Sequence, residues 1–93
     1  MVIGLLQVEL YLNDTNSLKQ KRSVISHLRT QVQKKFNVSF SEVGLQDVWG
    51  RADIAMTTAS AETQMIHKLF SALEKQIETF PAVRIVRRHT EIL

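Results

Sequence analysis

Ninety-three residues suffice for one domain with a single hydrophobic core and exclude two such cores. The chain has no cysteine, which excludes disulfides and thiolate metal sites and suits the reducing cytoplasm, the location we expect. The net charge of +3 is unevenly distributed, because residues 15–41 carry six basic side chains and no acid. Such a local excess indicates an anionic partner, although a charged helix face that is merely solvated would show it too.

Residues 2–12 (VIGLLQVELYL) alternate between two sides, which predicts a β-strand with one face buried and the other mixed. No Lys or Arg precedes Lys19, so the segment lacks the basic start of a signal peptide. It is also too short to span a bilayer, and we expect no membrane association. The mixed face holds Ile3, Leu5, Gln7, Glu9 and Tyr11.

A helix is predicted to follow the turn at residues 13–16 (NDTN). Ser17 and Gln20 have the spacing of a capping box, which places the helix start directly after Ser17. One face of this helix is apolar and should pack on the core. Its apolar residues are Leu18, Val24, Ile25, Leu28, Val32 and Phe36.

The first two turns of this helix carry cations where the helix dipole favours acids. Lys19, Arg22 and Arg29 share an arc of about 80° beside the apolar face, at about 100° per residue. Lys21 falls inside the apolar arc itself, so its ammonium must pass out beyond the helix end or find a partner. Two explanations of these cations stay open: they attach the helix to a neighbouring loop, or they bind phosphates.

The remaining elements are two strands, a second helix and a last strand. Residues 37–44 and 51–59 are predicted to be strands joined by a loop. Ser60 is expected to cap the second helix, whose apolar spacing continues to Phe80, and Pro81 follows the end of this helix. Residues 83–93 should form the fourth strand. Because no single alternation buries all its apolar residues, we expect a bulge or an edge position there.

The predicted order βαββαβ indicates a single ferredoxin-like domain over residues 1–93, an α/β (α+β) sandwich. Two helices should cover one face of a four-stranded antiparallel sheet with strand order 4-1-3-2. In this topology the start of the first helix lies beside the loop between the second and third strands. We therefore predict a structural cluster at this shared end, with the Lys21 ammonium near Glu42 or Asp47. Its members are Lys21, Glu42, Asp47, Trp49 and Arg51.

Four stretches of the sequence resemble one known family over essentially the whole chain. They are VIGLLQVELYL, NSLKQKRSVI, FNVSFSEVGLQDVWGRADIAM and the final EIL. They are similar to the YlxP-like family of small bacterial proteins, in which Gln20 is commonly an acid and Leu45 commonly a histidine. Roles that need a charge at 20 or an imidazole at 45 are therefore not implied. The resemblance implies a ferredoxin-like fold and, because the family's genes tend to lie among translation genes, a ribosome- or RNA-related role.

Motifs for catalysis are absent from the sequence, so we expect no enzyme, no cofactor and no metal. There is no Cys nucleophile, no G-x-S-x-G and no phosphate-binding glycine loop. Acylphosphatases share the strand order, but their arginine-bearing loop has no counterpart in NDTNS. The predicted third strand, residues 51–59, has no aromatic residue on which an RRM could stack bases. The histidines at 27, 67 and 89 lack metal-ligand spacing.

Three functions remain open, and the first is our expectation. The protein would bind RNA or ribosomal particles, with Lys19, Arg22 and Arg29 contacting phosphates. Alternatively, it would be a homodimeric protein-interaction module that pairs through the outer sheet face. A small enzyme acting on a phosphorylated compound is a third candidate. Trp49 would either close the end of the core as an apolar lid, which we favour, or stack on a base or partner.

Overall fold

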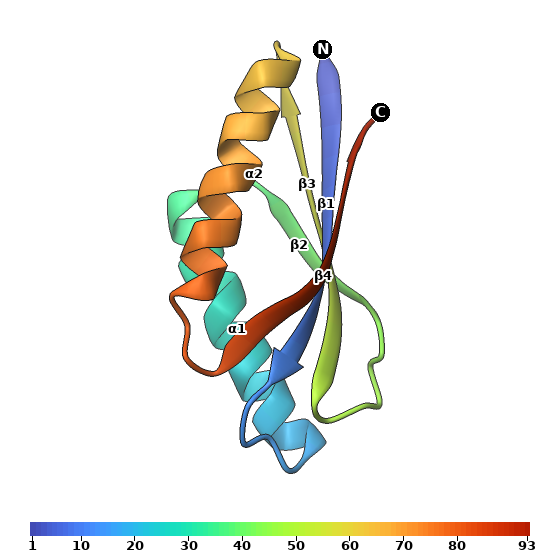
Figure 1. Cartoon of the computed structure of the whole chain (residues 1–93), viewed down its shortest axis with the longest axis vertical. Helices are drawn as coiled ribbons and strands as arrows, with labels where there is room; N and C mark the ends of the chain where they lie inside the picture. The colour runs from blue at the N-terminus through green and yellow to red at the C-terminus, as the bar shows by residue number, and fades with distance from the viewer.

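The computed structural model describes residues 1–93 and contains six regular elements (Figure 1). The order is the predicted βαββαβ. The start of β2 is two residues later than expected, and the other strand ends differ from prediction by at most one residue. The elements are β1 (Val2–Leu12), α1 (Leu18–Lys35), β2 (Ser39–Gly44), β3 (Arg51–Ser60), α2 (Thr63–Glu78) and β4 (Val83–Ile92).

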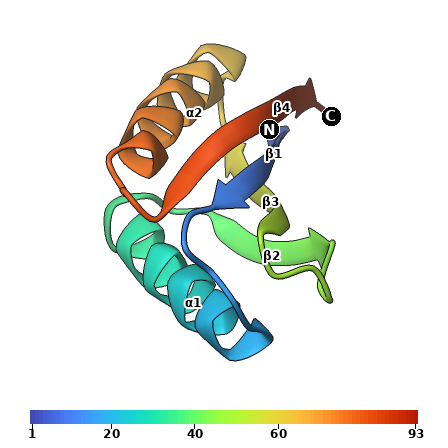
Figure 2. The same ribbon diagram turned by 60° about the horizontal axis from the view of Figure 1, so that its bottom comes forward.

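The four strands form one antiparallel sheet in the order β2-β3-β1-β4, and both helices cover the same face of it (Figures 1 and 2). This confirms the predicted ferredoxin-like sandwich and its strand order. The opposite face of the sheet, which we call the outer sheet face, carries no helix. The start of α1 and the loop between β2 and β3 lie at the same end of the domain, as the topology requires.

The core lies between the sheet and the helices, and it is one cluster of seventeen buried residues. The alternation in β1 is confirmed, because Leu6, Val8 and Leu10 are fully buried and their neighbours face outward. Gly4 is also buried, directly beneath α2. A Cβ atom at this position would overlap Cγ2 of Ile66, so the glycine allows α2 to approach the central strand closely.

The fourth strand shows both of the irregularities that its sequence predicted. It is an edge strand, since it pairs with β1 alone. Its register against β1 shifts between Glu9, which opposes Arg87, and Leu10, which opposes Ile85. Val86 is thus the extra residue of a β-bulge. The bulge lets Val83 and Ile85 face the core while Arg87 and His89 stay on the outer sheet face.

The predicted cap of the second helix is wrong. Ser60 belongs to β3, where it pairs with Val2, and α2 has Glu62 as its N-cap without a side-chain hydrogen bond. The hydroxyl of Ser60 accepts a hydrogen bond from the Glu62 backbone N–H at 3.3 Å. Pairing with β1 extends the strand to residue 60 and delays the helix by two residues, an effect that capping preferences alone do not include.

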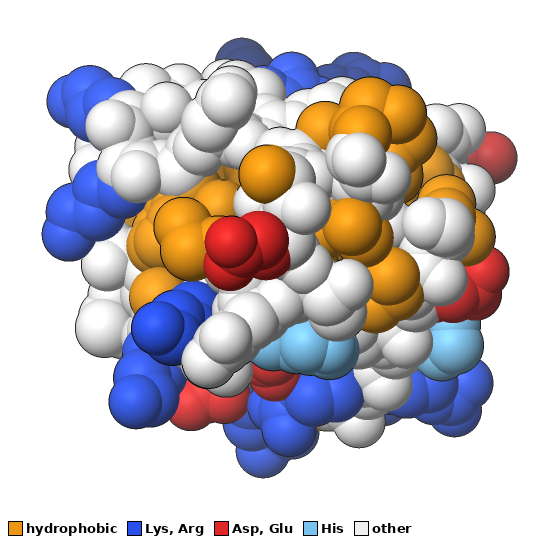
Figure 3. All heavy atoms as spheres, turned by 90° about the horizontal axis from the view of Figure 1, so that it is seen from above, with side chains coloured by type: hydrophobic (Ala, Val, Ile, Leu, Met, Phe, Trp, Pro, Cys, Tyr) orange, Lys and Arg blue, Asp and Glu red, His pale blue; other side chains and the backbone are white.

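The chain ends lie together at the end of the domain opposite the β2–β3 loop (Figure 1). The backbone N–H of Leu93 donates to the carbonyl of Ile3 at 2.8 Å. Figure 3 views this end and shows hydrophobic side chains spread across it, with Lys and Arg mostly around the margin. Met1, Met65 and Leu93 are among the most exposed large apolar side chains of the molecule. This end is therefore more apolar than an ordinary solvated surface needs.

Candidate nucleic-acid interface

The start of α1 is capped by neutral side chains. Ser17 Oγ accepts from the Gln20 backbone N–H at 3.1 Å, as the capping box predicts. The reciprocal bond differs, because Gln20 Oε1 accepts from the N–H of Asn16, at 2.7 Å, rather than from that of Ser17. The neutral amide of Gln20 thus accepts the backbone hydrogen bond that a Glu carboxylate could accept at this position. The first turn contains no acid, so the nearby cations have no carboxylate beside them within the helix.

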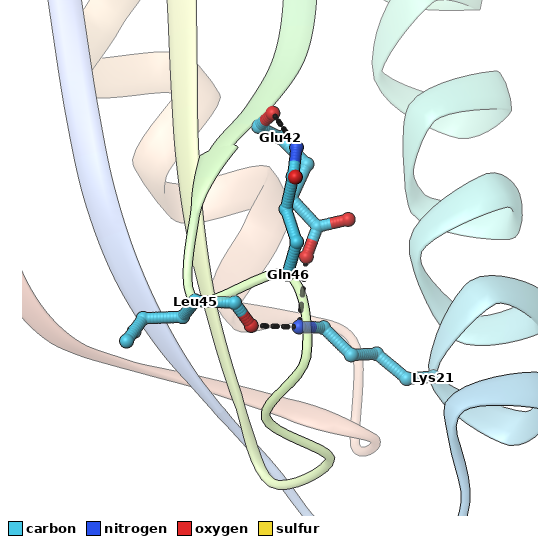
Figure 4. Close-up of polar contacts among 4 residues, drawn as sticks. All are labelled: Lys21, Glu42, Leu45 and Gln46. Carbon is cyan, nitrogen blue, oxygen red and sulfur yellow. Dashed lines mark hydrogen bonds and ion pairs between the residues drawn. The ribbon is translucent and has the colours of Figure 1, made fainter.

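Lys21 points inward from the first turn of α1 toward the loop between β2 and β3 (Figure 4). Only 2% of its surface is exposed. Its Nζ lies 2.8 Å from Oε2 of Glu42 and donates a hydrogen bond to the carbonyl of Leu45 at 2.6 Å. We call these contacts of Lys21 with Glu42 and Leu45 the lysine clasp. They confirm the prediction that the Lys21 ammonium lies near a carboxylate, with Glu42 as the partner.

The contact with Glu42 is an ion pair more than a directed hydrogen bond. Oε2 of Glu42 is buried and receives no hydrogen bond of ordinary geometry, although Nζ is only 2.8 Å away. The Glu42 side chain is 22% exposed, so water still reaches part of the carboxylate. A nearly buried ammonium without such a partner would cost several kcal/mol. The cost that the pairing avoids is larger than the roughly 0.3–1 kcal/mol that a cation loses beside the start of a helix.

The lysine clasp also positions the hairpin loop, by which we mean residues 45–50. Leu45 adopts a left-handed backbone with φ 57°, a conformation that costs a non-glycine residue free energy. Its carbonyl accepts from Lys21 and also from the N–H of Val48 at 3.0 Å. Gln46 donates to the Glu42 carbonyl, and Gly50 accepts from the N–H of Leu12 at 2.9 Å. Both ends of the loop are thus attached to regular structure.

The predicted five-residue cluster forms only in part, as the pair of Lys21 and Glu42. Asp47 is exposed and forms no ion pair. Arg51 turns to the outer sheet face, where Nη1 lies 2.9 Å from Glu9 Oε2. Trp49 is 52% exposed, so the favoured interpretation of this residue as a lid on the core is wrong. The buried Leu12 and the stem of Lys21 occupy that end of the core instead.

Lys19, Arg22 and Arg29, which we call the basic stripe, are exposed and form no ion pair. The guanidinium of Arg29 lies 5.4 Å from the ring centroid of Phe40 in β2. The opposite flank of α1 faces the segment between α2 and β4, since the rings of His27 and Phe80 are 5.7 Å apart. The basic stripe therefore runs along the side of α1 that borders β2.

The outer sheet face carries charged residues that the sequence analysis missed. Tyr11 lies between two arginines, with the guanidiniums of Arg51 and Arg84 at 5.7 and 5.2 Å from its ring centroid. Arg84 and Arg87 form no ion pair. Finding them would have required the register of β4, which the bulge at Val86 conceals. This half of the face is polar rather than apolar, which disfavours it as a dimer surface.

No group of three or more His, Asp or Glu side chains is placed to hold a metal ion. None of the helices has both the length and the apolar character needed to cross a membrane.

The fold and the basic stripe define a ferredoxin-like domain with an exposed cationic helix. Residues 3–90 match the family model described as "Protein of unknown function (DUF503)", and the chain belongs to that family. It is 36% identical over 90 residues to "Uncharacterized protein YlxP" of Bacillus subtilis (strain 168), covering 97% of this chain and 98% of that protein. The resemblance seen in the sequence is thereby confirmed.

A solved structure supports the fold independently of the family. The chain is similar to the NMR structure of LFR1 1, a de novo designed protein with a ferredoxin fold. The TM-score is 0.57 at 18% identity, and the alignment covers 98% of this chain and 86% of the designed one. At this identity the similarity bears on the fold alone.

Proposed function

We propose that this protein is a non-enzymatic, cytoplasmic RNA-binding protein that contacts phosphates through the basic stripe of α1. The observation that carries the proposal is the state of the three cations. Lys19, Arg22 and Arg29 are exposed along one side of a single helix, and none of them pairs with a carboxylate. Other cations are unpaired too, but these three follow one another along α1 with no acid in its first turn. Unpaired cations in a row match the repeating negative charge of a nucleic-acid backbone.

RNA is the proposed polyanion, in keeping with the role that the family resemblance implies, and ribosomal particles are the proposed larger assembly. Contact between cations and phosphates makes and breaks no covalent bond, so the proposed role is binding. Phosphate contacts of this kind give affinity without reading sequence directly. We therefore expect the protein to bind RNAs of different sequence with similar affinity and to lose that affinity as salt rises.

The test is a titration of labelled RNA with the protein at several salt concentrations. The logarithm of the binding constant should fall linearly with the logarithm of salt concentration. For single-stranded RNA, three phosphate contacts predict a slope of about −2. In cell lysate, the protein should sediment with ribosomal particles at low salt and separate from them at high salt. Absence of RNA binding even at low salt would contradict the proposal.

A second candidate function is self-association through the outer sheet face, at the end where the termini lie. There Ile3 and Leu5 lie across from Ala59 and Thr57, which leaves an uncharged strip along β1 and β3 that Glu91 of β4 borders. Ile3 is 38% exposed, and the apolar end shown in Figure 3 continues this surface. Two copies related by a two-fold axis could cover such a patch mutually.

The homodimer is tested by light scattering at micromolar concentration. Wild-type protein should show about twice the monomer mass, and Ile3→Lys should reduce it by placing like charges across the two-fold axis. Ser71→Lys adds the same charge at an exposed position in the middle of α2, away from both the outer sheet face and the apolar end, and is the matched control. A monomer at high concentration would rule out this function and leave the RNA-binding proposal unaffected.

A further inference from the structure

The hairpin loop and the end of β2 carry four of the ten large apolar residues that are exposed in this chain. Val43, Leu45, Val48 and Trp49 are all at least 40% exposed. Trp49 is the only tryptophan of the chain and is 52% exposed. An exposed tryptophan with no role in closing the core favours a ligand that stacks on its ring or packs against it.

The position of this tryptophan is fixed by the fold rather than left to a free loop. Lys21 holds the Leu45 carbonyl on one side of the hairpin loop, and Leu12 holds the Gly50 carbonyl on the other. Leu45 is retained in a left-handed conformation that an unrestrained leucine avoids. A loop held at both ends in this way loses little backbone entropy when a ligand binds to a side chain that it carries.

The same clasp places the loop that carries the tryptophan beside the start of α1, where the basic stripe begins. Arg29 marks the β2 side of α1, because its guanidinium lies against Phe40. Arg22 lies two turns earlier on the same flank, about 10 Å closer to the helix start. The hairpin loop lies beside that helix start in both ribbon views. The basic stripe therefore leads along the border of β2 toward Trp49.

We propose that Trp49 stacks on an unpaired base of the RNA whose phosphates lie along the basic stripe. This inference rests on the proposed function and narrows it to single-stranded segments. A duplex keeps its bases stacked on one another, whereas an unpaired base has a free face for an aromatic ring. The charge of the adjacent stripe favours a nucleic acid over an apolar peptide as the ligand.

The experiment uses Trp49 as its own probe. Oligouridine, an abasic ribose-phosphate oligomer of equal length and duplex RNA are titrated into the full chain, while intrinsic fluorescence and the anisotropy of the labelled oligomer are both recorded. Oligouridine should quench the fluorescence, and the abasic oligomer should bind more weakly without quenching it. Trp49→Ala should weaken oligouridine binding about tenfold or more and leave abasic binding unchanged.

Two further variants make the result specific. Trp49→Phe keeps an aromatic ring and should retain most of the affinity, whereas Val48→Ala removes exposed apolar surface from the same loop and should change little. Thermal melts should be the same for all of these variants, because both side chains are exposed.

Failure of this inference and failure of the proposed function are distinguishable. If oligouridine binds with the expected salt dependence but Trp49→Ala binds it equally well, the stacking inference is overturned and the phosphate-binding proposal stands. If Trp49→Ala weakens the abasic oligomer as much as oligouridine, stacking is likewise overturned. If none of the three RNAs binds at low salt, both proposals fall.

Discussion

Replacing Lys21 with methionine is expected to lower the free energy of unfolding by about 3 kcal/mol. Methionine fills the same space on the apolar face of α1 but leaves the Glu42 carboxylate without its counter-charge. It also leaves the Leu45 carbonyl without the donor that lies 2.6 Å away. The effect stays near the lower end for a broken buried pair, because Glu42 is partly exposed. Denaturant titration of the purified variant measures it.

A control and a second variant separate the ion pair from general effects. Lys19→Met removes an exposed cation two residues away and should change stability by no more than about 0.5 kcal/mol. Adding Glu42→Gln to Lys21→Met should recover part of the loss, since it removes the unpaired charge while the Leu45 carbonyl stays unsatisfied. If Lys21→Met costs no more than Lys19→Met, the lysine clasp does not stabilise the fold as described.

The double reversal Lys19→Glu with Arg22→Glu is expected to weaken RNA binding roughly a thousandfold at low salt. Two attractions to phosphates become repulsions, and each is worth on the order of 1 kcal/mol in water at contact distance. The salt dependence on single-stranded RNA should become shallower by about 0.7 per lost contact, from a slope of about −2 to about −0.7. Stability should be unchanged or slightly higher, because acids at the start of α1 suit the helix dipole. A salt-titrated binding assay and thermal melts on the same sample measure both.

The control for this variant makes the same change in net charge elsewhere. Lys68→Glu with Lys75→Glu reverses two exposed cations on α2, away from the basic stripe, and should weaken binding far less. If the reversal on α1 lowered stability with binding unaltered, Lys19 and Arg22 would have a structural role and the phosphate-binding proposal would be wrong.

The fold could be predicted from the sequence because its local patterns agree with one another. The alternation in β1 and the apolar face of α2 each specify a buried side, and the strand order follows from packing rules. Lys21 was identifiable for the same reason, since a cation in an apolar arc must have a partner. Lys21 pairs with Glu42 and not with Asp47. That outcome depended on the register shift between Glu42 and Gly44, which decides which side chains β2 turns toward α1.

The parts that could not be predicted depend on strand register and on the exact course of loops. Arg51 was predicted to join the cluster at the shared end because of its position in the sequence. The register of β3 against β1 instead places it opposite Tyr11 and within reach of Glu9. Trp49 was expected to be buried because large aromatic residues usually are. Its exposure follows from the hairpin loop, whose course is set by Lys21 and by the left-handed backbone of Leu45. No local pattern encodes such contacts between distant segments.

The central position of β1 has a consequence for the order in which the chain folds. The hairpin of β2 and β3 joins strands that are close in sequence, so closing it costs little chain entropy. Strand β1 must instead meet β3 and then β4, which lies at the far end of the chain. Until it does, β3 and β4 both present unpaired edges that other chains could bind. The first strand along the chain therefore cannot complete its pairing before the last strand is in place.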